Sequence, residues 1–468
     1  MDAIVLSLIS HTNVGKTALA RTLLRRDVGE VADRAHVTIV SEAHTMIETD
    51  EAVMRLWDTP GFGSALAKLV GRLRKSENPV GWLLHQVWDR VTDKSLWCSQ
   101  EAIRNIRNDA DVVLYLVDAS QEPAGVGYVN LEMEILEWIG KPVLVLLNQT
   151  GDPKPDADAA EVAAWRDHLS QFEHVRKVMP LDAFARCWVQ ERELLDQVAN
   201  VLTESQQLTV QQLQKAWRER NLETFKNAAE VLGRWMADSA NDVEEIAEPT
   251  VLERLGLNRG ERSRELERAR KALCDRLAER AKSAIDELIR LYGLEGETAR
   301  KLHDAKQNEI LEKQPVNEAF WGALGCVASG AAAGLAADLL AGGLTLGGGM
   351  IAGAVAGGAG GFAIAKGYNL ARGEKNTVRW SEEYFMDIIK LALSSYLAVA
   401  HFGRGRGRWQ DGDAPAFWNE QVAKVVEAEA KELGRIWNEP SPGIAARTLE
   451  SLLRQLLVEL YPDTGAFV

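Results

Sequence analysis

Hydrophobic residues in the N-terminal part of the chain form short, continuous runs separated by polar turns and by stretches with helical spacing. The stretches that we interpret as strands are residues 3–9, 111–118 and 142–148, which are continuous apolar runs, and residues 53–58, in which apolar and polar positions alternate. Continuous apolar runs of this length are typical of strands buried on both faces, as in a parallel sheet. Helices fit between them, for example over 131–140. The pattern predicts a doubly wound, Rossmann-like α/β domain over residues 1–200.

The remainder of the chain has mainly the pattern of amphipathic helices. Apolar residues follow helical spacing from residue 201 onwards, and the stretch 261–293 is the clearest long amphipathic helix. We therefore predict a helical domain over 201–318. A C-terminal helical region is predicted over 367–468, and a segment of different composition lies between them at 319–366.

The segment 319–366 is rich in glycine and hydrophobic residues. Glycine occupies 14 of the 44 positions from 322 to 365, and Asp338 is the only charged residue among them. Small residues recur every four positions, a spacing that lets helices approach closely, so we predict a helical hairpin with arms at 320–341 and 346–366. Two interpretations stay open. The hairpin inserts into a bilayer, or it packs inside a soluble helical domain, because Asp338 and the scarcity of large apolar residues disfavour a spanning helix.

Composition and charge narrow the functional classes. The chain has 468 residues and a formal net charge of −14, and an acidic chain gains little from a phosphate backbone, so general nucleic-acid binding is not expected. Its four cysteines are far apart and form no CxxC pair, which argues against a zinc site or a disulfide framework. The N-terminus lacks the pattern of a secretory signal. We expect a cytoplasmic protein, with peripheral or conditional attachment to the inner membrane under the bilayer interpretation.

A phosphate-binding loop follows the first predicted strand. Residues 10–17, SHTNVGKT, match GxxxxGK[ST] except that Ser10 replaces the first glycine. In such a loop backbone N–H groups point at phosphate oxygens, Lys16 carries a positive charge to the β- and γ-phosphates, and the Thr17 hydroxyl binds Mg²⁺. The helix that follows directs its N-terminal dipole at the phosphates. His11 is interpreted as filler within the loop. The nucleotide-contacting residues of this part are predicted to be Asn13, Val14, Gly15, Lys16, Thr17 and Ala18.

Two further elements complete the predicted catalytic site. The sequence DTPG at 58–61 matches the DxxG element of GTPases, in which Asp58 would hold Mg²⁺ through a water and the Gly61 N–H would contact the γ-phosphate. Thr38 is placed to be the switch threonine that closes on Mg²⁺ and the γ-phosphate. We therefore predict Lys16, Thr38 and Gly61 as catalytic residues, and Thr17, Thr38 and Asp58 as metal ligands.

These motifs resemble those of the Era- and TrmE-like branch of the translation-factor class of GTPases. Asn13 stands in NxGK[ST], as in members that use a potassium ion, and DTPG is the usual form of DxxG in this branch. Phe62 stands where Ras-like proteins carry a catalytic glutamine. The resemblance implies that no glutamine orients the attacking water. It implies that K⁺ beside Asn13, or a nucleotide-dependent dimer, supplies the missing stabilisation.

The base-reading loop departs from the NKxD pattern of that family. Asn148 fits the first position, but Gln149 replaces the lysine and Asp152 comes one residue late. Guanine preference is expected, with an ATPase that has an altered base loop as the alternative. Asp182 and Ala183 lie where the last base-contacting loop is expected. Asn148, Gln149, Asp182 and Ala183 are therefore added to the predicted nucleotide-binding residues.

The whole chain resembles a poorly characterised bacterial family that joins such a GTPase domain to a long C-terminal extension of unknown function. Residues 338–349 and 401–407 carry sequence typical of that family. We expect a Mg²⁺-dependent protein that binds GTP and GDP. Because the GTPase domain and the helical region stand in one chain, we expect the nucleotide state to control the helical region, with a membrane or protein partner for 319–366. A membrane-active effector gated by nucleotide is a further alternative. The arginines Arg404, Arg406 and Arg408 are interpreted as part of a solvated loop.

Overall fold

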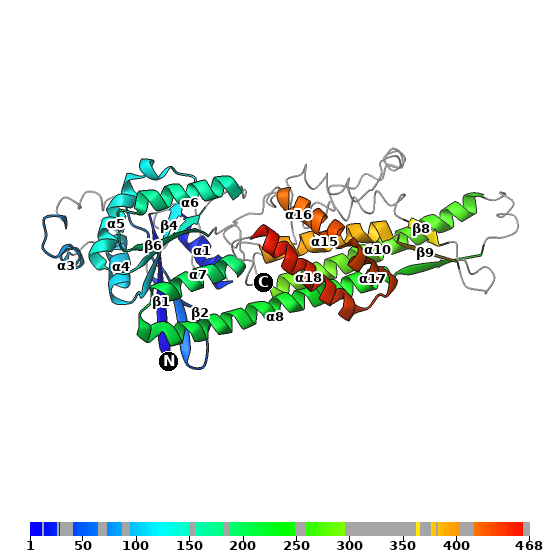
Figure 1. Ribbon diagram of the computed structural model, residues 1–468, viewed down its shortest axis with the longest axis horizontal. Coiled ribbons are helices and arrows are strands. Elements are labelled where there is room, and N and C mark those ends of the chain that lie inside the picture. Colours follow the sequence, from blue (N-terminus) through cyan, green and yellow to red (C-terminus); the bar gives the residue numbers. More distant parts are fainter. Residues whose placement is uncertain are drawn as a thin grey trace. The chain divides into compact units, whose positions relative to one another are not determined.

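The computed structural model describes residues 1–11, 14–25, 28, 41–63, 73–86, 94–148, 155–181, 188–248, 259–294, 362–365, 376–380, 382–401 and 416–461. The chain forms two compact units. One contains Met1–Leu222, and the other contains Glu223–Ala400 and the C-terminal helices. In Figure 1 the sheet of the first unit is drawn in blue and cyan, and the helices of the second run from green to red.

A six-stranded sheet forms the centre of the first unit, with the strand order β2-β3-β1-β4-β5-β6. The strands are β1 (Asp2–Ser10), β2 (Glu42–Glu48), β3 (Ala52–Asp58), β4 (Val112–Asp118), β5 (Val143–Asn148) and β6 (Val175–Pro180). β2 is antiparallel to β3, and all other neighbours are parallel. The predicted α/β fold with a mostly parallel sheet is confirmed. The sequence pattern misses β2, because most side chains of this edge strand are exposed or half-buried.

Helices lie on both sides of this sheet (Figure 1). They are α1 (Lys16–Leu24), α4 (Lys94–Asn108), α5 (Gly127–Ile139), α6 (Pro155–Leu169) and α7 (Trp188–Val201), with short 3₁₀ turns at Pro123–Gly125 and Glu204–Gln206. The short helix α3 (Pro79–His85) packs against α4 and α5 instead. Alternate residues of β4, such as Val113 and Tyr115, join an apolar cluster with residues of α4, α5 and α6. Their neighbours Leu114 and Leu116 are equally buried. Burial on both faces explains why β4 and β5 are continuous apolar runs.

The second unit is mainly helical. Its elements are the second half of α8 (Gln207–Ala240), β7 (Val243–Ile246), α10 (Arg259–Leu291), β8 (Phe362–Ala365), β9 (Asn376–Trp380), α15 (Glu382–Ala400), α16 (Ala416–Ala428), α17 (Ala430–Asn438) and α18 (Pro442–Leu460). The long amphipathic helix predicted over 261–293 is α10, and the predicted C-terminal helices are α15 to α18. Among the described helices, none is both long and apolar enough to cross a bilayer.

A small antiparallel sheet, β7-β9-β8, corrects one sequence expectation. Residues 362–365 end the second arm of the predicted helical hairpin, but they form the strand β8. The physical reason is the ladder with β9, in which Phe362 pairs with Trp380 and Ala365 with Thr377. The remainder of 319–366, including Asp338, lies outside the described residues.

Close packing of α8 against α18 gives a stability prediction. A Cβ atom added to Gly233 of α8 would lie 2.5 Å from the backbone nitrogen of Ala446 of α18. Gly233→Ala is therefore expected to lower the thermal unfolding midpoint, because the clash costs about 1–3 kcal/mol against roughly 1 kcal/mol gained in helix propensity. Gly443→Ala is the control, since its Cβ would meet only Arg447 Nη1 at 3.9 Å. A Gly233→Ala protein with an unchanged or higher midpoint would contradict the packing.

Candidate nucleotide-binding site

The phosphate loop lies where β1 meets α1. β1 ends at Ser10 and α1 begins at Lys16, and Gly15 between them has φ +96°, in the left-handed region. The Gly15 carbonyl accepts the N–H of Leu19, the first hydrogen bond of the helix, at 2.9 Å. A Cβ on Gly15 would lie 2.8 Å from Asn148 Nδ2. Glycine is thus required here both by conformation and by space.

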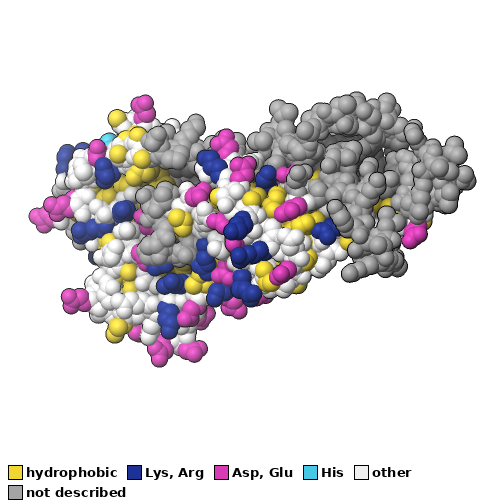
Figure 2. Space-filling view, turned by 45° about the vertical axis from the view of Figure 1, so that its right-hand side comes forward, with side chains coloured by type: hydrophobic (Ala, Val, Ile, Leu, Met, Phe, Trp, Pro, Cys, Tyr) yellow, Lys and Arg dark blue, Asp and Glu magenta, His cyan; other side chains and the backbone are white. Residues whose placement is uncertain are grey.

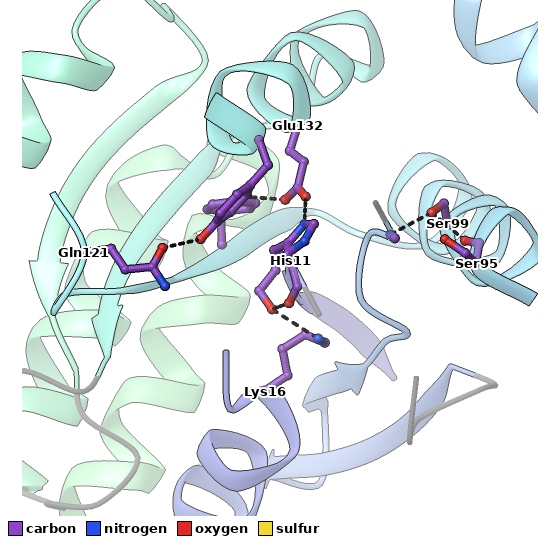
Figure 3. A network of polar contacts seen from close by, with 10 residues as sticks. His11, Lys16, Ser95, Ser99, Gln121 and Glu132 are labelled. Carbon is purple, nitrogen blue, oxygen red and sulfur yellow. Dashed lines mark hydrogen bonds and ion pairs between the residues drawn. The ribbon is translucent and has the colours of Figure 1, made fainter. Parts of the chain in front are cut away.

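Lys16 is buried at the centre of the site. Its Nζ donates to Ser10 Oγ over 3.1 Å (Figure 3). Burial lowers the pKa of Lys16, because it disfavours the charged ammonium, while the charges of Asp58 and Glu132 act to raise it. Ser10, which departs from the consensus glycine, thus provides the hydroxyl that holds the lysine.

Thr17 and Asp58 meet beside the lysine. Thr17 Oγ1 donates to Asp58 Oδ2 over 2.7 Å, and both side chains are buried. Within the described part of the chain, Asp58 Oδ1 is buried and has no hydrogen-bond partner. Burial raises the pKa of Asp58, while the Thr17 hydrogen bond and the Lys16 charge act to lower it. Two of the three predicted metal ligands, Thr17 and Asp58, are therefore brought together at the end of β3.

The DTPG element is fixed directly to the phosphate loop. The Phe62 N–H donates to the Ser10 carbonyl over 2.8 Å, and His11 forms a parallel bridge with Phe62. Thr59 Oγ1 donates to the Leu8 carbonyl over 2.7 Å. Gly61 is buried between these anchors. The predicted switch therefore begins beside the predicted phosphate site.

Asn148 connects β5 to the phosphate loop. Its Nδ2 donates to the Val14 carbonyl over 2.8 Å, and both residues are buried. The Asn148 carbonyl accepts the N–H of Ala119, which follows β4, over 2.7 Å. The first residue of the predicted base loop therefore supports the loop that would bind phosphate.

Removing the Asn148 amide tests this support. Asn148→Ala leaves the buried Val14 carbonyl without its donor, which costs about 1–3 kcal/mol, so we expect GTP affinity to fall roughly tenfold to a hundredfold. Ser120→Ala is the control, because Ser120 Oγ donates to Asp118 at the end of the neighbouring strand in an exposed hydrogen bond. Titration with a fluorescent GTP analogue measures both. Wild-type affinity in Asn148→Ala would rule out the supporting role.

One network at the loop is not predicted from the sequence. His11 Nδ1 lies 2.6 Å from Glu132 Oε1, and Tyr115 donates its hydroxyl to Glu132 Oε2 over 2.6 Å (Figure 3). Glu132 occupies the buried side of α5 with Val129 and Leu136. Residues 129, 132 and 136 have the spacing of one helix face. An acidic residue among the apolar residues of this face could therefore have indicated a buried polar contact at Glu132.

Several predicted site residues lie outside the described part of the chain. Val14 and Ala18 are described and buried. Among the described residues, no group of three or more His, Cys, Asp or Glu side chains could hold a metal ion by itself. The undescribed predicted residues are Asn13, Thr38, Gln149, Asp182 and Ala183, and Asp152 of the base-reading loop is also undescribed.

Comparison with protein families identifies the two parts of the chain. Residues 5–149 match the family described as 50S ribosome-binding GTPase. Residues 166–441 match the family described as a domain of unknown function (DUF3482), and this match spans more than half of the chain. The chain belongs to the DUF3482 family. Its N-terminal part is a GTP-binding, GTP-hydrolysing P-loop domain, which confirms the predicted GTPase joined to a C-terminal extension of unknown function.

Solved structures similar to this GTPase include two of Era. One is a variant of Era from Aquifex aeolicus bound to GDP and aluminium fluoride, at 16% identity, covering 63% of this chain and 90% of that one, with a TM-score of 0.32. Another is Era with MgGDPNP and a segment of 16S ribosomal RNA, at 17% identity, covering 63% and 99%, with a TM-score of 0.33. A search of curated protein sequences gives no significant match.

Proposed function

We propose that this GTPase requires Mg²⁺ and that its nucleotide state controls the helical region. The observation that supports the metal is the buried contact between Thr17 Oγ1 and Asp58 Oδ2, together with the Asp58 Oδ1 atom that has no partner among the described residues. Hydroxyl and carboxylate oxygens are the ligands that Mg²⁺ prefers, with nucleotide phosphates completing the set. The donor set therefore fits Mg²⁺, which Thr17 and Asp58 would hold with Thr38. When bound, Mg²⁺ neutralises charge on the β- and γ-phosphates.

The chain's own residues would bind and orient the nucleotide. Lys16 would leave Ser10 Oγ and place its ammonium on the phosphates, since a triphosphate is a stronger acceptor than a hydroxyl. Gly15 and its neighbours would present backbone N–H groups. Gly61 would donate its N–H to the γ-phosphate and sense its loss.

Phe62 cannot orient the attacking water. Its side chain is fully buried in the apolar cluster and carries no polar atom. We therefore propose that K⁺ near Asn13, or a nucleotide-dependent dimer, supplies the missing transition-state stabilisation. GTP turnover should be at least about tenfold faster in K⁺ than in Na⁺, or should rise with protein concentration per molecule. Equal, concentration-independent turnover in both salts would contradict both routes.

A route from the phosphate loop to α8 supports the control of the helical region. Arg25 closes α1 in the left-handed conformation, with φ 56°. Its guanidinium bonds Asn221 Oδ1 of α8 and lies 3.5 Å from Glu191 of α7. Asn221 and Glu191 are almost fully buried. Because α1 follows the phosphate loop directly, a shift of α1 on nucleotide exchange would act on α8 through Arg25.

Hydrogen exchange of α8 tests this coupling. Amide exchange near Asn221 is expected to differ between GDP and a non-hydrolysable GTP analogue. The difference should disappear in Arg25→Ala with GTP binding retained. Arg234→Ala is the control, because Arg234 lies later in α8 and makes an exposed ion pair with Glu287. Identical exchange in both nucleotide states of the wild type would overturn the coupling.

The partner proposed for 319–366 is a membrane or a protein, contacted by an otherwise cytoplasmic protein at the inner membrane. The support is the recurrence of small residues and the near absence of charge. On the face drawn in Figure 2, Lys and Arg side chains of the described residues are interspersed with Asp and Glu, a distribution that does not favour nucleic acid there. Flotation with liposomes is the test, and a protein that stays unbound in every nucleotide state refutes the membrane partner.

A further inference from the structure

The phosphate loop is tied to α5 by a buried carboxylate with no role in the nucleotide contacts described above. Glu132 is 3% exposed, and its two oxygens contact His11 Nδ1 and the Tyr115 hydroxyl, each at 2.6 Å. The His11 ring also stacks on Tyr128, with ring centroids 4.2 Å apart. Figure 3 shows His11 between Glu132 and Lys16. Two side chains of α5 thus hold one side chain of the phosphate loop.

Core packing alone does not explain a buried carboxylate at this position, because its burial is unfavourable in free energy. Burial of a carboxylate has a desolvation cost that pairing and hydrogen bonds often do no more than offset. Burial raises the pKa of Glu132, and the His11 contact is the largest of the effects that lower it, ahead of the Tyr115 hydrogen bond and the Lys16 charge. An apolar residue on the same face of α5 would fill the space without that cost. The pair therefore points to a role in holding the loop.

The contacts of His11 show which parts of the site depend on its position. His11 forms the bridge with Phe62, and the preceding residue, Ser10, accepts the Phe62 N–H and the Lys16 ammonium. The Ser10 hydroxyl also bonds the His11 carbonyl. A displaced His11 would therefore disturb the phosphate loop, the DTPG element that precedes Phe62, and the Ser10 hydroxyl that accepts the hydrogen bond of Lys16.

We propose that Glu132 is a positioning residue for nucleoside-triphosphate binding, which acts through His11 to fix the phosphate loop against the DTPG element. Glu132 touches no substrate; it orients the imidazole between itself and Tyr128. The inference rests on GTP binding at this site. Tyr115 donates a hydrogen bond to the same carboxylate but does not belong to the phosphate loop. A Tyr115 variant therefore shows the effect of losing a partner of the buried Glu132 charge without losing the contact to the loop.

The experiment compares four variants with the full-length wild type. Glu132→Gln and His11→Phe each remove the charge-assisted contact, and His11→Phe keeps the stacking on Tyr128. Each is expected to weaken binding of a fluorescent GTP analogue by about tenfold, since each removes a hydrogen bond to a charged group. The double variant should bind within about twofold of either single variant, because both changes remove one contact. Tyr115→Phe should bind within about twofold of wild type.

Thermal midpoints without nucleotide accompany each titration. If Glu132→Gln does not fold, His11→Phe and Tyr115→Phe still carry the comparison. Glu132→Gln or His11→Phe with wild-type affinity would overturn the proposal. So would a Tyr115→Phe protein that loses as much affinity, or losses that multiply in the double variant. A wild-type protein that fails to bind GTP would instead overturn the GTP site on which the proposal rests.

Discussion

Lys16→Ala is expected to reduce GTP affinity by at least about a hundredfold, because a buried ammonium that contacts a phosphate contributes several kcal/mol. The variant also removes the positive charge that Lys16 supplies near Asp58 and Glu132, two buried carboxylates that act on it. The negatively charged triphosphate would then enter a site in which these two charged side chains are also negative. Titration with a fluorescent GTP analogue measures the loss.

Arg21→Ala is the matched control for that loss of charge. Arg21 lies on the same helix, and its Nε donates to the Val28 carbonyl over 2.6 Å. Removing it takes away one positive charge without touching the phosphate loop, so affinity should stay within about threefold of wild type. A Lys16→Ala protein that binds GTP as tightly as Arg21→Ala would contradict the placement of the triphosphate beside Lys16.

Gly15→Ala is expected to have the second largest effect on nucleotide binding. The left-handed conformation costs an alanine about 1–2 kcal/mol, and the new Cβ would meet Asn148 Nδ2 at 2.8 Å. Relief of that contact requires the loop to move away from Asn148, which breaks the hydrogen bond to Val14. We expect GTP affinity to fall by at least about thirtyfold, the equivalent of roughly 2 kcal/mol.

Gly140→Ala separates backbone strain from the steric contact. Gly140 ends α5 with φ +76°, and a Cβ there would meet nothing within 4 Å. This variant should lose thermal stability by strain alone and keep its affinity for GTP. If the two glycine variants lose affinity equally, the contact between Gly15 and Asn148 does not explain the requirement for glycine.

The parts of the fold that the sequence predicts are those with a local signal. β4 and β5 are continuous apolar runs because both of their faces are covered, and α10 has a long amphipathic pattern. β2 lacks such a run because it is an edge strand with few buried residues. The small sheet joins β7 to β9, whose pairing brings Val243 opposite Arg379. No local pattern reports a pairing between residues so far apart in the sequence.

The same distinction applies to the site. Lys16, Thr17 and Asp58 belong to short motifs, and the structure brings them together as their spacing predicts. The consensus alone does not say that Ser10 holds Lys16, because that depends on how the loop closes. Glu132 is missed because it contacts His11 across 121 positions of sequence. Its only local trace is an acidic residue on the buried face of α5.

Competition between GTP and ATP tests the central claim most directly. Turnover of GTP by the full-length protein would be measured with Mg²⁺ and K⁺, with ATP added in increasing excess. We predict GTP hydrolysis that depends on Lys16 and that about a hundredfold excess of ATP does not inhibit. The reason is that the polar groups of a site that hydrogen-bonds guanine would have no partners when adenine is bound. Equal competition by ATP, or turnover that survives Lys16→Ala, would contradict a GTPase site at this phosphate loop.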